Sequence, residues 1–197
     1  MIDQTTQEYN AVIAQCRDLF LKKAQDYGTS WQILRMPMPS VTDQIYIKAE
    51  RIRSLQETGQ NKVGDSEEGE FVAIINYCVI ALLLLDAYEM GGAEIPDGPE
   101  QLQIAYDAKV KYAFEIMLAK NHDYGEAWRK MRVSSITDLI LMKIFRLKQI
   151  EDQSGELLVS EGPDANYVDM LNYAVFCLIK MGFATSASSN TSETSSN

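Results

Sequence analysis

Apolar residues recur along this chain at steps of three and four positions, which is the period of an α-helix. Within residues 7–25 these positions are Val12, Ile13, Cys16, Leu19 and Phe20. Residues 102–118 show the same spacing, and no stretch keeps the strict alternation of a half-buried strand. The pattern predicts an all-α protein.

Glycine and proline, which usually interrupt helices, are few and clustered. The 11 Gly and 5 Pro leave six long segments free of both. These segments are 1–27, 40–58, 70–90, 100–124, 126–154 and 164–181. Each of them is long enough for a helix.

The sequence repeats itself with a period of about 96 residues, and four motifs recur in the same order in both halves. They are Asp26-Tyr27-Gly28-x-x-Trp31 and Asp123-Tyr124-Gly125-x-x-Trp128, Ser40-Val41-Thr42-Asp43 and Ser135-Ile136-Thr137-Asp138, Lys48-x-x-Arg51 and Lys143-x-x-Arg146, and Asn76-Tyr77 and Asn172-Tyr173. A three-helix half would leave apolar faces uncovered. We therefore expect a tandem duplication of a three-helix unit, packed as one pseudo-two-fold helical bundle.

The repeat sets the expected domain organisation. The first repeat spans residues 7–89 and the second spans residues 101–183, with a connector at 90–100 that contains Gly and Pro. Residues 184–197 are mostly Ser, Thr and Asn. Such a segment buries little apolar surface, so we expect a disordered tail.

The charge balance excludes some partners. Lys and Arg number 18 against 28 Asp and Glu, for a net charge of −10. Non-specific binding to nucleic acid requires many cations, and so does a basic helix at a membrane surface. The apolar run at 71–85 is shorter than the roughly 20 residues that span a bilayer, so we expect a buried core helix there and no membrane partner.

The cysteines and the single histidine suggest no catalytic centre of their own. Cys16, Cys78 and Cys177 form no C-x-x-C pair and lie in apolar segments, which is typical of buried thiols in a cytoplasmic protein. The start of the chain has no recognisable signal peptide. We expect His122 to be solvated rather than catalytic.

Two interpretations of the Asp-Tyr-Gly-x-x-Trp motif remain open. In the structural one, Gly28 and Gly125 end their helices in the left-handed conformation. In the functional one, the aspartates bind a ligand or pair with Arg35 and Arg132, and the rings stack on a base. The candidate ligand-binding residues of this motif are Asp26, Tyr27, Trp31, Asp123, Tyr124, Trp128 and Arg132.

The Lys-x-x-Arg and Ser-x-Thr-Asp motifs also have two interpretations each. Lys48 and Arg51, and likewise Lys143 and Arg146, share one helix face, where they would bind phosphate oxygens or pair with acids such as Glu50, Asp43 or Asp138. Ser40 with Asp43, and Ser135 with Asp138, match the capping box at a helix start. A second, catalytic use of Asp138 stays open.

The last predicted helix of the second half carries inward-facing polar residues. Asp169 and Asn172 share one face of an otherwise apolar segment, and Glu161 precedes it. Carboxylates in such a place favour a hard cation, so we expect Mg²⁺ at Glu161 and Asp169, and Asn172 as a ligand-binding residue. Ala73 stands at the equivalent of Asp169, which would restrict the metal to the second repeat.

Taken together, the motifs resemble the nucleotide modification associated domain 1 family, a domain of unknown function, in two copies. The second half fits best, through Lys120 to Trp128 and Val159 to Gly162. The resemblance implies a link to modified-nucleotide metabolism. A more distant similarity is to the all-α, MazG-like NTP pyrophosphohydrolases, which hold Mg²⁺ on Glu and Asp; Glu161-x-x-Asp164 has one of their two spacings.

Two hypotheses about function follow. In the first, the protein binds a nucleotide or related phosphorylated small molecule, and any catalysis is Mg²⁺-dependent hydrolysis with Asp138, Glu161 and Asp169 as catalytic residues. In the second, it is a non-catalytic helical scaffold, with a homodimer among its partners, and the repeated motifs are structural.

Overall fold

The structure is a computed structural model that describes residues 2–27, 36–61, 64–91, 98–153 and 162–183. Its α-helices are α1 (Ile2–Tyr27), α3 (Met38–Thr58), α4 (Glu67–Glu89), α5 (Pro99–Tyr124), α6 (Val133–Asp152) and α7 (Pro163–Lys180), with the short 3-10 helix η1 (Ala127–Lys130) after α5. No strand occurs within these ranges, so the all-α fold is confirmed. The predicted tail at 184–197 and most of the predicted connector lie outside the described residues.

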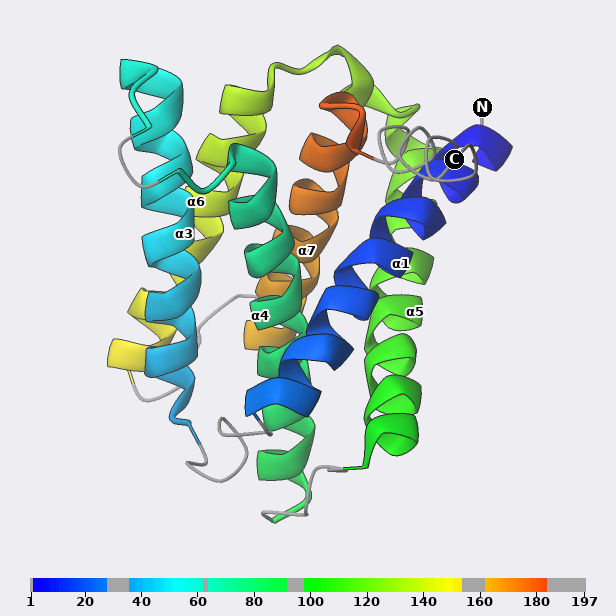
Figure 1. Cartoon of the computed structure of the whole chain (residues 1–197), viewed down its shortest axis with the longest axis vertical. Helices are drawn as coiled ribbons and strands as arrows, with labels where there is room; N and C mark the ends of the chain where they lie inside the picture. The colour runs from blue at the N-terminus through cyan, green and yellow to red at the C-terminus, as the bar shows by residue number, and fades with distance from the viewer. Residues whose placement is uncertain (1, 28–35, 62–63, 92–97, 154–161, 184–197) are drawn as a thin grey trace, which may run out of the picture.

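Equivalent helices of the two repeats pack in pairs (Figure 1). α3 lies along α6, α4 along α7, and α1 beside α5. The α4–α7 pair occupies the centre of the bundle, between the other two pairs. This arrangement confirms the tandem duplication and its packing as one pseudo-two-fold bundle.

The central helix α4 is the most apolar element of the fold. Its side chains from Phe71 to Leu84 are almost all buried, which confirms the expected core helix. By length and composition α4 also passes a test for a membrane span, but most of it is buried inside the bundle. All three cysteines are free thiols in this core, as expected.

Helix boundaries confirm one predicted cap and correct another. Gly125 ends α5 with φ +60° and ψ +39°, the left-handed cap conformation; Gly28 lies outside the described residues. The capping boxes are wrong. α3 and α6 begin two residues before Ser40 and Ser135, and the residues that precede these helices, Pro37 and Arg132, make no side-chain cap.

Two buried hydrogen bonds cross between the repeats with the same geometry. Asn76 of α4 accepts a bond of 2.9 Å from the Tyr106 hydroxyl of α5. Asn172 of α7 accepts a bond of 2.9 Å from the Tyr9 hydroxyl of α1. Each asparagine also donates to a backbone carbonyl of its own repeat. The repeated asparagines therefore join the two repeats.

The repeated Thr-Asp residues join α3 to α6. The Thr42 hydroxyl donates to Glu151 of α6 at 2.6 Å, and Thr137 accepts at 3.1 Å from the equivalent residue of α3, Gln56. The aspartates form crossed ion pairs. These pairs are Asp43 with Lys148 at 2.6 Å, and Asp138 with Arg53.

Candidate functional site

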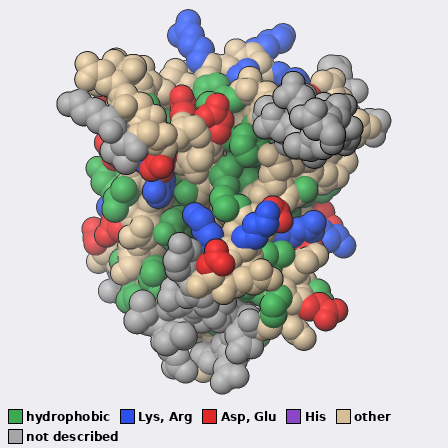
Figure 2. All heavy atoms as spheres, in the orientation of Figure 1, with side chains coloured by type: hydrophobic (Ala, Val, Ile, Leu, Met, Phe, Trp, Pro, Cys, Tyr) green, Lys and Arg blue, Asp and Glu red, His purple; other side chains and the backbone are tan. Residues whose placement is uncertain are grey.

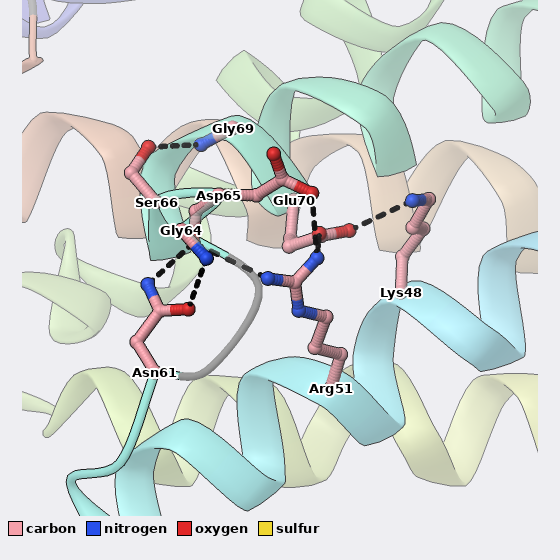
Figure 3. A network of polar contacts seen from close by, with 8 residues as sticks. All are labelled: Lys48, Arg51, Asn61, Gly64, Asp65, Ser66, Gly69 and Glu70. Carbon is pink, nitrogen blue, oxygen red and sulfur yellow. Dashed lines mark hydrogen bonds and ion pairs between the residues drawn. The ribbon is translucent and has the colours of Figure 1, made fainter.

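Each repeat buries a carboxylate beside the lysine of its Lys-x-x-Arg motif. In the first repeat Glu70 of α4 is 2% exposed. Its carboxylate lies 3.1 Å from Lys48 Nζ and 2.6 Å from Arg51 Nη1. Figure 3 shows both cations of α3 directed at this carboxylate. A buried charge needs such partners, so Lys48 and Arg51 have an electrostatic role in the fold.

Arg51 also binds the loop that precedes α4. Its Nη1 lies 2.8 Å from Asp65 Oδ2, and this hydrogen bond holds the pKa of Asp65 below its usual value. Asn61 closes the loop by donating to the Asp65 carbonyl at 2.8 Å and accepting from the Gly64 N–H at 2.9 Å. The contacts are drawn in Figure 3. Two carboxylates thus neutralise the two cations of the first repeat.

The second repeat uses a different acid for its lysine. Asp169 of α7 is 5% exposed, and its two oxygens lie 2.5 Å from Lys120 Nζ and 2.7 Å from Lys143 Nζ. The acid therefore stands one helical turn further along α7 than Glu70 stands along α4. Ala73 occupies the equivalent of Asp169 in the first repeat, so the inner acid has changed its place rather than been lost.

The arginine of the second repeat has no described counter-ion. Asn166 occupies on α7 the position of Glu70 and is fully buried. Its Nδ2 donates to the Gly162 carbonyl at 3.0 Å, whereas its Oδ1 has no hydrogen-bond partner within the described residues. Arg146 is exposed, and the part of the chain that the structure describes gives it no ion pair.

We call Lys120, Lys143, Arg146 and Asp169 the second-repeat basic cluster. Among the described residues it contains three cations and one carboxylate, so these four side chains carry an excess of positive charge, whereas the net charge of the protein is −10. An arginine guanidinium offers a planar fork of N–H donors that matches two phosphate oxygens. This cluster is chemically suited to an anion.

The same geometry bears on the predicted Mg²⁺ site. The ammonium groups of Lys120 and Lys143 contact both oxygens of Asp169, and their positive charge opposes the binding of a metal ion there. The described residues hold no group of three or more Asp, Glu, His or Cys that suits a metal ion. Glu161 lies outside the described residues, so its pairing with Asp169 on Mg²⁺ stays a prediction.

Trp128 is not free to stack on a base, which corrects the expectation for it. The indole is 6% exposed and stacks on Phe176 with ring centroids 4.3 Å apart and an angle of 3°. The Arg129 guanidinium covers its other face at 4.4 Å from the centroid. Trp128 is a core residue; its equivalent, Trp31, lies outside the described residues.

The other members of that motif lie at the surface. Asp26 is exposed, and Tyr124 is 73% exposed at the end of α5. Asp123 contacts its exposed neighbour His122 at 3.1 Å instead of Arg132. Arg132 is exposed where α6 begins. Tyr27 ends α1, but its side chain lies outside the description.

Two predicted site residues have structural partners instead. Asp138 pairs with Arg53, and neither belongs to the second-repeat basic cluster. Asn172 is 4% exposed, and its amide is occupied by Tyr9 and a backbone carbonyl, so it does not face a ligand. The Lys-x-x-Arg motifs pair with Glu70, Asp65 and Asp169 rather than with Glu50, Asp43 or Asp138.

A buried polar cluster that the sequence pattern does not reveal connects α1 to η1. Glu126 is 8% exposed and adopts φ +54°, and it binds the hydroxyl of the fully buried Thr5. Burial raises the pKa of Glu126, but the Thr5 hydrogen bond and Arg129 outweigh it and leave the pKa lowered. Arg129 also contacts Glu8 at 2.8 Å. No spacing signal marks these residues.

A groove between α1 and α5 is the other place where cations collect. It has a volume of about 350 Å³ and includes Arg17, whose Nη1 lies 2.9 Å from both oxygens of Asp107. Figure 2 shows Lys and Arg side chains across the middle of this face, with acidic side chains beside them. Because Arg17 is already paired, the groove is less suited to an anion than the second-repeat basic cluster.

Comparison with known proteins identifies one family. A family model described as nucleotide modification associated domain 1 matches residues 23–85 and again residues 120–181, so two matches cover more than half of the chain. The two segments correspond to the two repeats. No curated protein and no solved structure matches the chain. The similarity to MazG-like pyrophosphohydrolases finds no support there.

Proposed function

We propose that this chain, which belongs to the nucleotide modification associated domain 1 family, binds a nucleotide or a related phosphorylated small molecule through its second-repeat basic cluster. The name of the family associates it with nucleotide modification, and the basic cluster provides chemistry for the phosphates. Arg146 and Lys143 would contact phosphate oxygens, and Lys120 would add a third positive charge.

The observation that carries this proposal is the contrast between Arg146 and Arg51. The two arginines occupy equivalent positions, yet Arg51 contacts two carboxylates while Arg146 has none within the described residues. Asn166 in place of Glu70 is the change that removes one carboxylate. A bound phosphate would supply the negative charge that Glu70 supplies in the first repeat.

We limit the proposal to binding. Hydrolysis through Mg²⁺ would require the metal to hold and activate a water near the phosphate. Two lysines occupy the oxygens of Asp169, so nothing in the described residues adds to the magnesium prediction. Mg²⁺ nevertheless belongs in the test, because nucleotides are commonly bound with this ion.

The direct test is a thermal-shift screen of the full chain. Ribo- and deoxyribonucleoside mono-, di- and triphosphates, and inorganic phosphate, are tested with and without Mg²⁺. We expect at least one nucleotide to raise the melting temperature, because a ligand that binds only the folded state stabilises it. Arg146→Gln should abolish the shift, while Lys111→Gln, which alters an exposed lysine of α5, should keep it.

A specific observation favours the scaffold as a second candidate function. Several repeated residues are engaged in packing between the repeats, among them Asn76, Asn172, Thr42 and Thr137. These residues recur for structural reasons and need no ligand. If no nucleotide or phosphate stabilises the protein in the screen, the scaffold is the better account.

A further inference from the structure

A second cavity lies between the two repeats, where α3 begins and where α6 ends and α7 begins, toward the lower side of the bundle in Figure 1. Its volume is about 300 Å³, near the lower limit for a small-molecule site. The residues around it are Met38, Pro39, Leu85, Ile150, Glu151, Pro163 and Tyr167. All but Glu151 and Tyr167 are purely apolar, so the lining is mostly apolar, and Glu151 is its one charged residue.

A chain of hydrogen bonds fixes the polar side of the cavity. Thr42 donates its only hydroxyl proton to Glu151 Oε1 at 2.6 Å. The Tyr167 hydroxyl lies 2.7 Å from the Thr42 oxygen and must therefore be the donor of that bond. Thr42 and Tyr167 are both fully buried. The carboxylate of Glu151 is held in one orientation by these contacts.

Glu151 keeps one carboxylate oxygen available. Only its Oε1 has a hydrogen bond among the described residues. Burial raises the pKa of Glu151 and Asp43 and Asp152 reinforce this effect, whereas the Thr42 hydrogen bond and the charge of Lys148 oppose it; the pKa stays raised. The nearby cation Lys148 contacts Asp43 at 2.6 Å. Within the described residues Glu151 is thus a half-buried acid without an ion pair of its own, which is costly for the fold.

The first repeat shows that the fold does not require this acid. Gln56 occupies on α3 the position of Glu151, and Phe71 occupies on α4 the position of Tyr167. Gln56 hydrogen-bonds Thr137 in the same place where Glu151 bonds Thr42. Gln56 and Phe71 therefore fill these positions in the first repeat without an acid or a phenol. Packing alone does not explain why the second repeat has Glu151 and Tyr167 there.

We propose that this cavity is a binding site for a small planar molecule that carries a fork of N–H donors, such as an amidine or an amino-substituted heteroaromatic ring. The apolar wall accommodates the ring. Glu151 Oε2 accepts one N–H of the fork, and Oε1, which has a second lone pair beside its bond from Thr42, accepts the other. The site shares no residue with the second-repeat basic cluster, so it stands or fails independently of the phosphate proposal.

The test is calorimetric titration of the full chain with benzamidine, whose amidinium group is such a fork on a six-membered ring. We expect saturable one-to-one binding, with benzoate showing none because its carboxylate is repelled by Glu151. Glu151→Gln should weaken benzamidine binding by about tenfold or more, as expected for loss of a charge-assisted contact. Asp152→Asn removes an equal charge one residue away that makes no contact with the ligand, and it should weaken the affinity far less than Glu151→Gln does.

A folding check and a second cavity variant distinguish loss of the binding site from loss of the fold. Glu151→Gln should fold, because Gln56 already occupies the equivalent position, and a thermal melt checks this. Met38→Trp narrows the cavity without altering the carboxylate and should also weaken binding. The proposal is overturned if benzamidine shows no saturable binding, or if Glu151→Gln and Met38→Trp bind it as tightly as the unaltered protein does.

Discussion

The Tyr9 hydroxyl of α1 donates a hydrogen bond of 2.9 Å to Asn172 of α7, and it thereby connects the first repeat to the second. The pseudo-two-fold axis generates the same bond once more, from Tyr106 to Asn76 at 2.9 Å. Both tyrosines are fully buried, and burial raises their pKa well above the usual value. They therefore stay protonated and remain donors.

This symmetry predicts matched losses of stability. Tyr9→Phe leaves Asn172 without its donor, and Tyr106→Phe does the same to Asn76, so each should lower the free energy of unfolding by about 1–2 kcal/mol. Urea denaturation measures both. A loss confined to one variant would show that the two bonds are not equivalent.

Replacing the asparagine should cost more than replacing the tyrosine. Asn172→Ala leaves a buried hydroxyl and a buried carbonyl unpaired and removes packed atoms, for a loss of about 2–4 kcal/mol. The same denaturation experiment measures this. If Asn172→Ala left stability unchanged but abolished nucleotide binding, the ligand-binding interpretation of this residue would return.

Asp138 should behave as a residue of the α3–α6 contact and not as a catalytic residue. The Asp138 side chain has an exposed fraction of 54%, and its carboxylate pairs with Arg53. Exposed ion pairs contribute little, so Asp138→Asn should cost less than about 1 kcal/mol. It should leave any nucleotide-dependent thermal shift unchanged. Loss of that shift with a normal melting temperature would contradict this assignment.

A substitution at Asp169 distinguishes the proposed anion site from the predicted Mg²⁺ site. Asp169→Asn leaves Lys120 and Lys143 without this carboxylate, which should lower the free energy of unfolding by about 1–3 kcal/mol. The loss is smaller than for a fully buried ion pair because both lysines are partly exposed to water. The freed positive charge should tighten nucleotide binding. A metal site on Asp169 would instead give weaker, Mg²⁺-dependent binding.

Glu70→Gln is the matched control for Asp169→Asn. It removes the buried carboxylate of the first repeat and should cost stability by a similar amount, since Lys48 and Arg51 lose their counter-ion. Nucleotide affinity should stay the same. Isothermal titration of both variants measures the comparison.

Glu151 should give the stability of the protein a specific pH dependence. The folded protein holds this proton more tightly than the unfolded chain, where the pKa is about 4.3, so ionisation destabilises the fold. The contribution is fully present below pH 4.3 and is lost as the pH rises through the raised pKa of the folded state. Glu151→Gln should therefore be relatively more stable at pH 7 than at pH 4, as measured by denaturation. An unchanged difference between the two pH values would contradict it.

The sequence predicted the fold well because its strongest signals were periodic. Apolar spacing identified the helices, and the repeated motifs identified the bundle and its pseudo-symmetry. Motif identity was less informative about side-chain partners. The Thr-Asp residues resembled a capping box, yet their contacts are with a helix of the other repeat, at Glu151, Lys148 and Arg53. A sequence motif suggests partners that are close in the chain. It cannot show which helix from the other repeat packs against the residues of the motif.

The candidate site was predicted only in part for the same reason. Lys143, Arg146 and Asp169 were recognised, but Lys120 enters the cluster from α5 across the fold. The sequence predicts Asp169 as a metal ligand because the two lysines that pair with it lie 49 and 26 positions away in the chain. The sequence also predicts that Trp128 stacks on a ligand, because its spacing cannot show that Phe176 and Arg129 pack against the ring.

Arg146 is the residue on which the proposed anion site depends most directly, and one titration tests its role. The nucleotide that gives the largest thermal shift is titrated into the unaltered chain and into Arg146→Gln, with Lys111→Gln as control. Loss of a charged hydrogen bond of about 1.5–3 kcal/mol predicts that Arg146→Gln raises Kd by about ten- to a hundredfold, while the control keeps it. Equal affinity of Arg146→Gln and the unaltered chain would contradict the proposed site.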